Sequence, residues 1–186
     1  MTTIVDGNLG ISYPVTAGGT SATQASSSKV LQVTQAVKTN SFASSVGAIW
    51  GDISGLSVSI TPSSTSSKVL IIVDVKCAGT AGSSIVRSRI LRDSTPIYVG
   101  DAASNRPQSL GHYYQGSAAD NAYYIAQIGG TYLDSPSSVS SITYKVQIGA
   151  DTNAQTVYVN RTQGDRDTSY YDSRVVSSIT LMEIAA

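Results

Sequence analysis

The chain has 186 residues, enough for one sizeable β domain with a buried core. Its formal net charge is zero and only 13% of its residues are charged, so it has no field that would attract nucleic acid or an acidic membrane. Both classes of partner are therefore excluded. Low charge also gives little repulsion between copies of the chain, which favours association into an oligomer.

The cysteine content and the N-terminal residues bear on disulfide formation, secretion and membrane insertion. Cys77 is the only cysteine, so no disulfide can form within the chain, and we expect its side chain to be a small buried apolar group. The first residues lack the basic segment and apolar run of a signal peptide, and no stretch reaches the ~18 apolar residues of a membrane helix. A soluble product made in the cytoplasm is expected.

Residues 1–28 are expected to form an extended N-terminal arm. They contain several glycines and a Thr/Ser/Ala-rich run that ends at Ser28, with little apolar periodicity. The pattern changes at Lys29, and residues 29–186 are expected to fold as one β-sandwich domain.

Strand patterns then recur along the chain. Leu31, Val33, Gln35 and Val37 would share one face of the first strand. Residues 68–76 are nearly continuously apolar, as expected of a strand covered on both faces. Clear alternation predicts strands at 56–60 and 142–148, and further strands are expected at 85–91, 97–99, 110–114, 123–128, 156–160 and 175–184.

A polar turn appears twice and leads into a strand each time. Pro62 and Pro136 each begin a Pro-Ser-Ser segment, in which proline fixes φ and the serines bond to nearby backbone. Many short strands between such turns predict an all-β fold, an antiparallel, jelly-roll-like β-sandwich. The edge strands of a sandwich need cover, and charges are sparse here, so we expect a symmetric oligomer.

Residues capable of catalysis are few. His112 is the only histidine and Glu183 the only glutamate, and no serine lies in a Gly-x-Ser-x-Gly turn. Asp165 and Asp167 could be oxygen ligands for calcium, but their spacing is unspecific, and a solvated loop in which they mix with arginines is the favoured interpretation. We predict no catalytic residue, cofactor or metal site.

Tyrosine is the one residue type with a functional signal. Two adjacent pairs, Tyr113–Tyr114 and Tyr123–Tyr124, should each place one ring on either side of a sheet. Exposed tyrosines suit protein interfaces and sugar recognition because a large apolar ring ends in a hydrogen-bonding group. Packing between subunits, packing in the core, and a glycan or receptor surface remain open for these four residues.

Several motifs resemble phage proteins. The segment Gly7-Asn-Leu-Gly-Ile-Ser-Tyr-Pro14 resembles short Gly-Ile-x-Tyr/Phe-Pro segments of phage tail fibres. The long run from Trp50 to Lys68 resembles a fibre-tip domain of marine and cyanobacterial phages, as do shorter motifs at 92–94, 132–136, 159–161 and 177–184. The resemblance implies a virion protein with a jelly-roll trimer similar to tumour-necrosis-factor and complement-head folds.

The length of the N-terminal arm is the feature that bears on whether the protein lies on the capsid or on the tail. Tail fibres have a long attachment domain and shaft, whereas this chain begins at Met1 with a short arm. We therefore expect a homotrimeric decoration, or cement, protein on the capsid, made in the host cytoplasm. Its partner would be the major capsid protein or another virion protein, contacted through Ile11, Tyr13 and Pro14, and its tyrosines could contact a host surface glycan. Alternatives are a tail-fibre or tailspike tip that binds the receptor and, more remotely, a carbohydrate-active tail enzyme.

Overall fold

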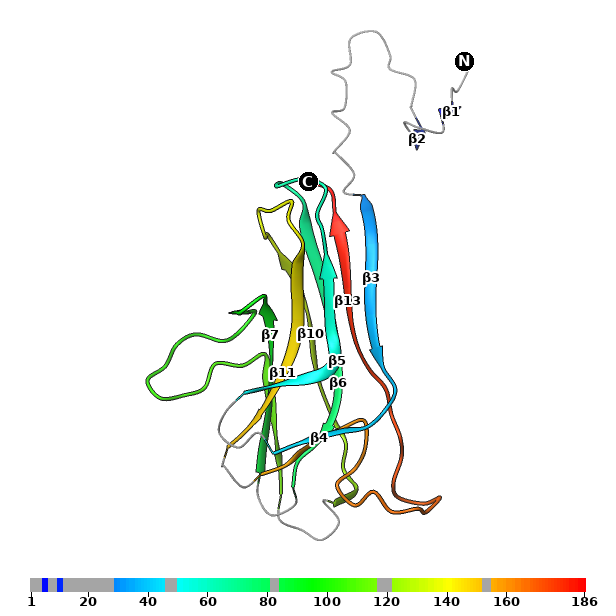
Figure 1. Ribbon diagram of the computed structural model, residues 1–186, viewed down its shortest axis with the longest axis vertical. Helices are drawn as coiled ribbons and strands as arrows, with labels where there is room; N and C mark the ends of the chain where they lie inside the picture. The colour runs from blue at the N-terminus through cyan, green and yellow to red at the C-terminus, as the bar shows by residue number, and fades with distance from the viewer. Residues whose placement is uncertain are drawn as a thin grey trace.

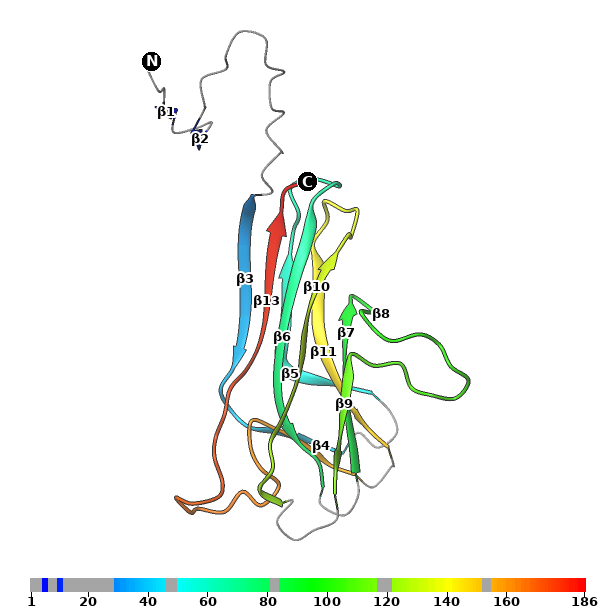
Figure 2. The same cartoon turned by 180° about the vertical axis from the view of Figure 1, so that it is seen from behind.

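The computed structural model of the chain is an all-β sandwich of two antiparallel sheets, as predicted (Figures 1 and 2). The structure describes residues 5–6, 10–11, 29–45, 50–80, 84–116, 122–151 and 155–186. Within these ranges, the only helical residues form a short turn at 122–123. No helix in the described parts of the chain is long and apolar enough to cross a membrane.

The first sheet contains six strands. Four long strands lie in the order β3, β13, β6, β10, and two short strands, β12 and β4, extend the sheet beside the end of β6. Their bounds are β3 Val30–Lys38, β4 Phe42–Ser44, β6 Lys68–Ala78, β10 Ala126–Asp134, β12 Val157–Val159 and β13 Ser177–Ile184.

The second sheet contains five strands. Its order is β5, β11, β7, and β7 then pairs along different parts of its length with β8 and with β9. Their bounds are β5 Gly51–Ile60, β7 Ser84–Arg92, β8 Thr95–Ile97, β9 Gly111–Gln115 and β11 Ile142–Ala150. Two further short strands, β1 (Val5–Asp6) and β2 (Gly10–Ile11), pair only with each other among the described residues.

The core lies between the two sheets. Alternate residues of β6 and β11 point into it, among them Val69, Ile71, Tyr144 and Val146, all fully buried. Cys77 belongs to the same cluster, as predicted, and burial raises the pKa of its thiol to about 12. A thiol held in this way is a packing group and is not reactive near neutral pH.

Two strand predictions need correction. A strand was expected from Tyr123, but β10 begins at Ala126, because Tyr123 is part of the helical turn. The strand expected at 97–99 is β8, which ends at Ile97; Tyr98 has a φ of 51°, outside the extended region. The pattern also missed the three-residue strand β4.

The prediction that both faces of β6 are covered is wrong for the single chain. Val69, Ile71, Val73 and Val75 are buried between the sheets. The residues between them point to the other side, where Ile72 is 36% exposed. The outer side of the central strand is therefore only partly covered, and it carries Leu70 and Ile72 between charged residues at both ends of the strand.

The sandwich is elongated and its two ends differ (Figures 1 and 2). The C-terminus, the start of β3 and both Pro-Ser-Ser turns lie at one end, where the Ala185 N–H donates to the Lys29 carbonyl at 2.9 Å. The short strands β4 and β12 and the loop of residues 160–176 lie at the other end. We call these the terminal end and the distal end.

Candidate interaction surfaces

A row of apolar side chains crosses the outer side of the six-stranded sheet. Val33 of β3, Met182 of β13, Leu70 of β6 and Leu133 of β10 lie directly opposite one another in neighbouring strands. Val33 is 54% exposed and Leu133 is 47% exposed. No described residue covers this row, so a broad apolar strip faces outward.

Further apolar residues extend this strip along the strands. Leu31 and Val37 lie on the same side of β3 as Val33, and each is about half exposed. Towards the distal end the surface becomes charged, with an ion pair between Lys76 and Asp74 of β6. We call the apolar part of this surface the apolar face; it consists of Leu31, Val33, Val37, Leu70, Ile72, Leu133 and Met182.

The outer side of the five-stranded sheet is different because it is polar. Asp52 of β5 forms an ion pair with Lys145 of β11 at 2.7 Å and accepts a hydrogen bond from Gln147 at 2.5 Å. The guanidinium group of Arg89 donates to Gln147 at 2.8 Å and lies over the Trp50 ring at 4.4 Å. This surface satisfies its own polar groups and suits contact with water, so of the two outer sheet surfaces the apolar face is the one that favours a partner.

The first predicted tyrosine pair lies on β9 and behaves as expected. Tyr113 is turned towards the core and Tyr114 is 60% exposed. Burial raises the pKa of Tyr113, and its hydroxyl donates to the side-chain oxygen of Gln115 at 2.8 Å. Tyr114 and Tyr124, which is 62% exposed, line one cavity of about 270 Å³ at the distal end.

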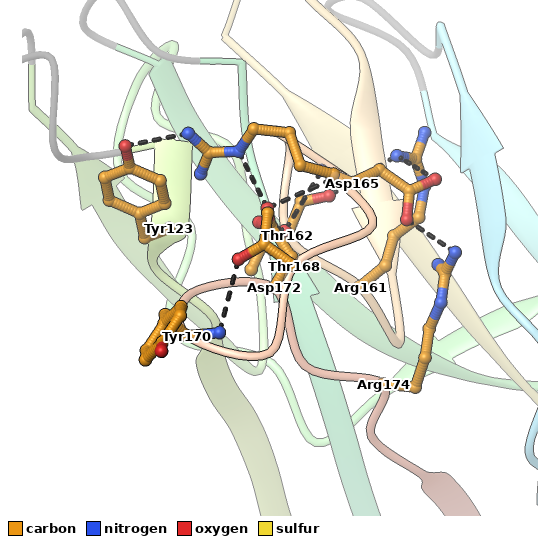
Figure 3. Close-up of polar contacts among 9 residues, drawn as sticks. Tyr123, Arg161, Thr162, Asp165, Thr168, Tyr170, Asp172 and Arg174 are labelled. Carbon is orange, nitrogen blue, oxygen red and sulfur yellow. Dashed lines mark hydrogen bonds and ion pairs between the residues drawn. The ribbon is translucent and has the colours of Figure 1, made fainter.

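The second pair is split between two sites. Tyr123 does not line that cavity; its ring stacks on Tyr171, with the centroids 4.8 Å apart. Arg166 lies over the Tyr123 ring at 4.0 Å and donates to the Tyr123 hydroxyl at 2.8 Å (Figure 3). The two tyrosine pairs of the sequence thus supply three cavity residues and one residue that anchors a loop.

The loop of residues 160–176 is held by its own ion pairs (Figure 3). Asp165 binds Arg161 at 2.9 Å and Arg174 at 2.5 Å, and Asp172 binds Arg166 at 2.8 Å. Hydrogen bonds from Arg166 and Thr162 lower the pKa of Asp172 to about 2. The aspartates mix with arginines, as in the favoured interpretation of the sequence.

The other candidate groups for chemistry lie apart from one another. His112 is exposed on β9 and makes no hydrogen bond to a described residue. Asp167 is exposed and its side chain pairs with no described residue, while the acids Asp165 and Asp172 are occupied by arginines. No group of three or more metal-binding side chains gathers within the described ranges.

Glu183, the only glutamate, anchors the first Pro-Ser-Ser turn. Its carboxylate accepts from the backbone and hydroxyl of Ser63 at 2.7 and 2.6 Å and from Gln32 at 2.6 Å. Burial alone would raise the pKa of Glu183, but these hydrogen bonds lower it to about 2. The buried carboxylate therefore stays charged and ties β3, the turn and β13 together at the terminal end.

The predicted capsid contacts lie mainly beyond the described residues. Ile11 is in β2, opposite Val5 of β1, and Tyr13 and Pro14 are outside the described residues. Comparison of the chain with protein-family models and with curated proteins finds no match. The interaction surfaces therefore have to be interpreted from their own chemistry.

Proposed function

We propose that this protein is a structural component of a bacteriophage virion, a homotrimer that decorates and stabilises the outside of the capsid. The observation that carries the proposal is the apolar face. The central strand β6 has apolar residues on both sides, yet the single chain covers only one of them. A second copy of the chain is the partner best suited to cover the other, because a chain of low charge repels its own copies weakly.

The outer surface of the six-stranded sheet is large enough to contribute to a subunit interface. Nine-residue strands are about 30 Å long and four neighbouring strands span about 15 Å, so this whole surface, with the apolar face as a part of it, measures roughly 450 Å² before side-chain relief is added. Specific interfaces bury about 800 Å² per partner, which is of the same order.

The resemblance to phage fibre-tip motifs supports the virion as the place of action, and the N-terminal segment supplies the proposed attachment. Residues 1–28 of each subunit would contact the major capsid protein, with Ile11, Tyr13 and Pro14 as contact residues. Three arms per trimer raise one another's effective concentration, so weak individual contacts give slow dissociation. Residue 29 begins at the terminal end, which leaves the distal end free to face outward.

Deletion of the arm tests the attachment. A chain that lacks residues 2–28 is expected to form the same oligomer and to lose its binding to capsid shells in a sedimentation assay. A matched control replaces residues 2–28 by a Gly/Ser segment of equal length and should also fail to bind. Undiminished binding of either variant would contradict the role of the arm.

A receptor-binding tip of a tail fibre is the second candidate. The exposed tyrosines Tyr114, Tyr124, Tyr170 and Tyr171 at the distal end favour it, because they are suited to contact a host surface. Copy number separates the candidates: a decoration protein occurs in hundreds of copies per particle and a fibre tip in a few tens at most. A stained gel of purified virions, calibrated with the major capsid protein, measures this number.

A further inference from the structure

The cavity at the distal end is a concave site that is lined by exposed aromatic rings. It lies between the end of β9 and the start of β10, and has a volume of about 270 Å³. Drug-sized ligands usually occupy about 300–1,000 Å³, so this cavity suits one small ring. Its lining comes from two segments, residues 113–116 and 124–126.

The described part of the lining is uncharged. It consists of three tyrosines, a glutamine, a glycine, an isoleucine and an alanine, and none of these offers an ionic group to hold a phosphate or a carboxylate. The loop of residues 160–176 does carry arginines, but Arg161, Arg166 and Arg174 are paired with its own aspartates. The cavity therefore favours a neutral ligand.

Two aromatic rings in this lining are not used by the protein itself. Tyr123 stacks on Tyr171, and Tyr98 stacks on Tyr132 at 4.9 Å. Tyr114 and Tyr124, in contrast, stack on no ring or cation, and their hydroxyls make no hydrogen bond, within the described residues. Both side chains are more than half exposed, so an apolar ring face and a polar hydroxyl are available from each.

The base of the cavity is fixed beforehand. The side-chain oxygen of Gln115 accepts from the Tyr113 hydroxyl at 2.8 Å and from the Gly79 N–H at 3.0 Å. Gln115 is only 2% exposed, so these bonds form beneath the cavity and hold the end of β9 in place. A preformed base lowers the cost of ordering the site when a ligand binds.

We infer that this cavity is a binding site for a neutral saccharide, with one pyranose ring lying against Tyr114 and Tyr124. A sugar ring has an apolar face of C–H groups that stacks on a phenol ring, and hydroxyls at its rim that bond to the tyrosine hydroxyls. The site does not require the proposed assembly, since none of its residues belongs to the apolar face. The inference names neutral saccharides as the ligand class for a host contact through the exposed tyrosines.

Saturation-transfer NMR on the full chain tests the site with three neutral probes: methyl α-glucopyranoside, methyl β-galactopyranoside and N-acetylglucosamine. At least one is expected to bind with a dissociation constant in the millimolar range, as expected for a ligand of this size. Tyr114→Ala and Tyr124→Ala should each weaken binding about three- to tenfold. The matched control is Tyr170→Ala, which removes a tyrosine 85% exposed outside the cavity and should leave binding unchanged.

The conservative variant Tyr114→Phe keeps the ring and removes the hydroxyl, so it should bind more tightly than Tyr114→Ala. An amide NMR spectrum of each variant checks that it is folded. The inference would be overturned if the wild-type chain transferred saturation to none of the three neutral sugars. It would also be overturned if both alanine variants gave the same saturation transfer as the wild type. Stronger binding of the charged sugar N-acetylneuraminic acid would overturn the neutral ligand class. None of these results depends on oligomeric mass, so this inference and the proposed assembly can fail separately.

Discussion

Asn160 connects three separate parts of the six-stranded sheet at the distal end. Its side-chain amide donates to the carbonyls of Lys38 and Asn40 at 2.6 and 3.2 Å, and its side-chain oxygen accepts from Ser177 at 2.6 Å. Its backbone N–H donates to the Lys76 carbonyl at 2.9 Å, and its φ of 61° is one that asparagine tolerates better than most residues. Asn160, Lys38 and Ser177 are buried.

Replacement of Asn160 by alanine should therefore be costly. The Asn160→Ala chain is expected to lose about 2–4 kcal/mol of unfolding free energy, because the buried Lys38 carbonyl and the Ser177 hydroxyl lose their partner. Urea unfolding followed by circular dichroism measures the loss. Asn105→Ala, at an exposed asparagine, is the matched control and should stay within about 0.5 kcal/mol. Equal stability of the two variants would contradict the connecting role.

Glu183 should make stability depend on pH in the acid range. Because the folded state lowers the pKa of Glu183 from 4.5 to about 2, the stabilisation is present above pH 4.5 and is lost as the pH falls towards 2. Between pH 7 and pH 2.5, the unfolding free energy of the Glu183→Gln chain should therefore fall by about 1–2 kcal/mol less than that of the wild type. Unfolding free energies at several pH values between 7 and 2.5 test this, and curves of identical slope would show that the carboxylate has no such role.

Sequence patterns predicted some of these residues and not others. The opposite orientations of Tyr113 and Tyr114 follow from strand alternation alone, and burial of Cys77 follows from its place in an apolar strand. Nothing local marks Asn160, because its partners are more than 15 residues away in the chain. Tyr124 meets Tyr114 only because β9 and β10 come together in the folded chain, which the sequence does not show.

At the scale of elements, β3 is the most accessible part of the proposed interface. It is an edge strand that pairs with β13 on one side only, and Val33 stands near the middle of its exposed face. Sequence patterns predicted a strand well where apolar and polar residues alternate regularly, as in β11. They failed where the backbone leaves the extended conformation early, as at Tyr98, and where a strand has only three residues, as in β4.

A charge placed on the apolar face should separate the subunits. Val33→Asp and Leu133→Asp are each expected to fold as the wild type does and to shift the protein to the mass of one chain, because a carboxylate would be buried without a partner. Sedimentation velocity measures the shift. The matched control, Ser57→Asp, adds the same charge to an exposed serine on the polar face of β5 and should remain oligomeric. Unchanged mass in both face variants would show that the interface lies elsewhere.

At the scale of the whole molecule, the sandwich separates its surfaces by direction. One long side carries the apolar face, the opposite side satisfies its own charges, and the distal end gathers exposed tyrosines. Such a division suits the proposed subunit. It would contact its own copies along one side and the capsid through the segment that leaves the terminal end, and its distal end would face the solvent. Sequence alone predicted the fold class but could not identify the face that we propose for association, since this face depends on which side of β6 the second sheet covers.

The mass of the full chain in solution tests the central claim most directly. Sedimentation equilibrium at micromolar concentration should give a mass above the 19.3 kDa of one chain, because the apolar face needs cover that only another copy provides in a pure sample. The resemblance to trimeric heads sets the expected mass at three chains. A mass of 19.3 kDa throughout the concentration range would show that the face is stable in water, and would contradict the proposed trimeric assembly.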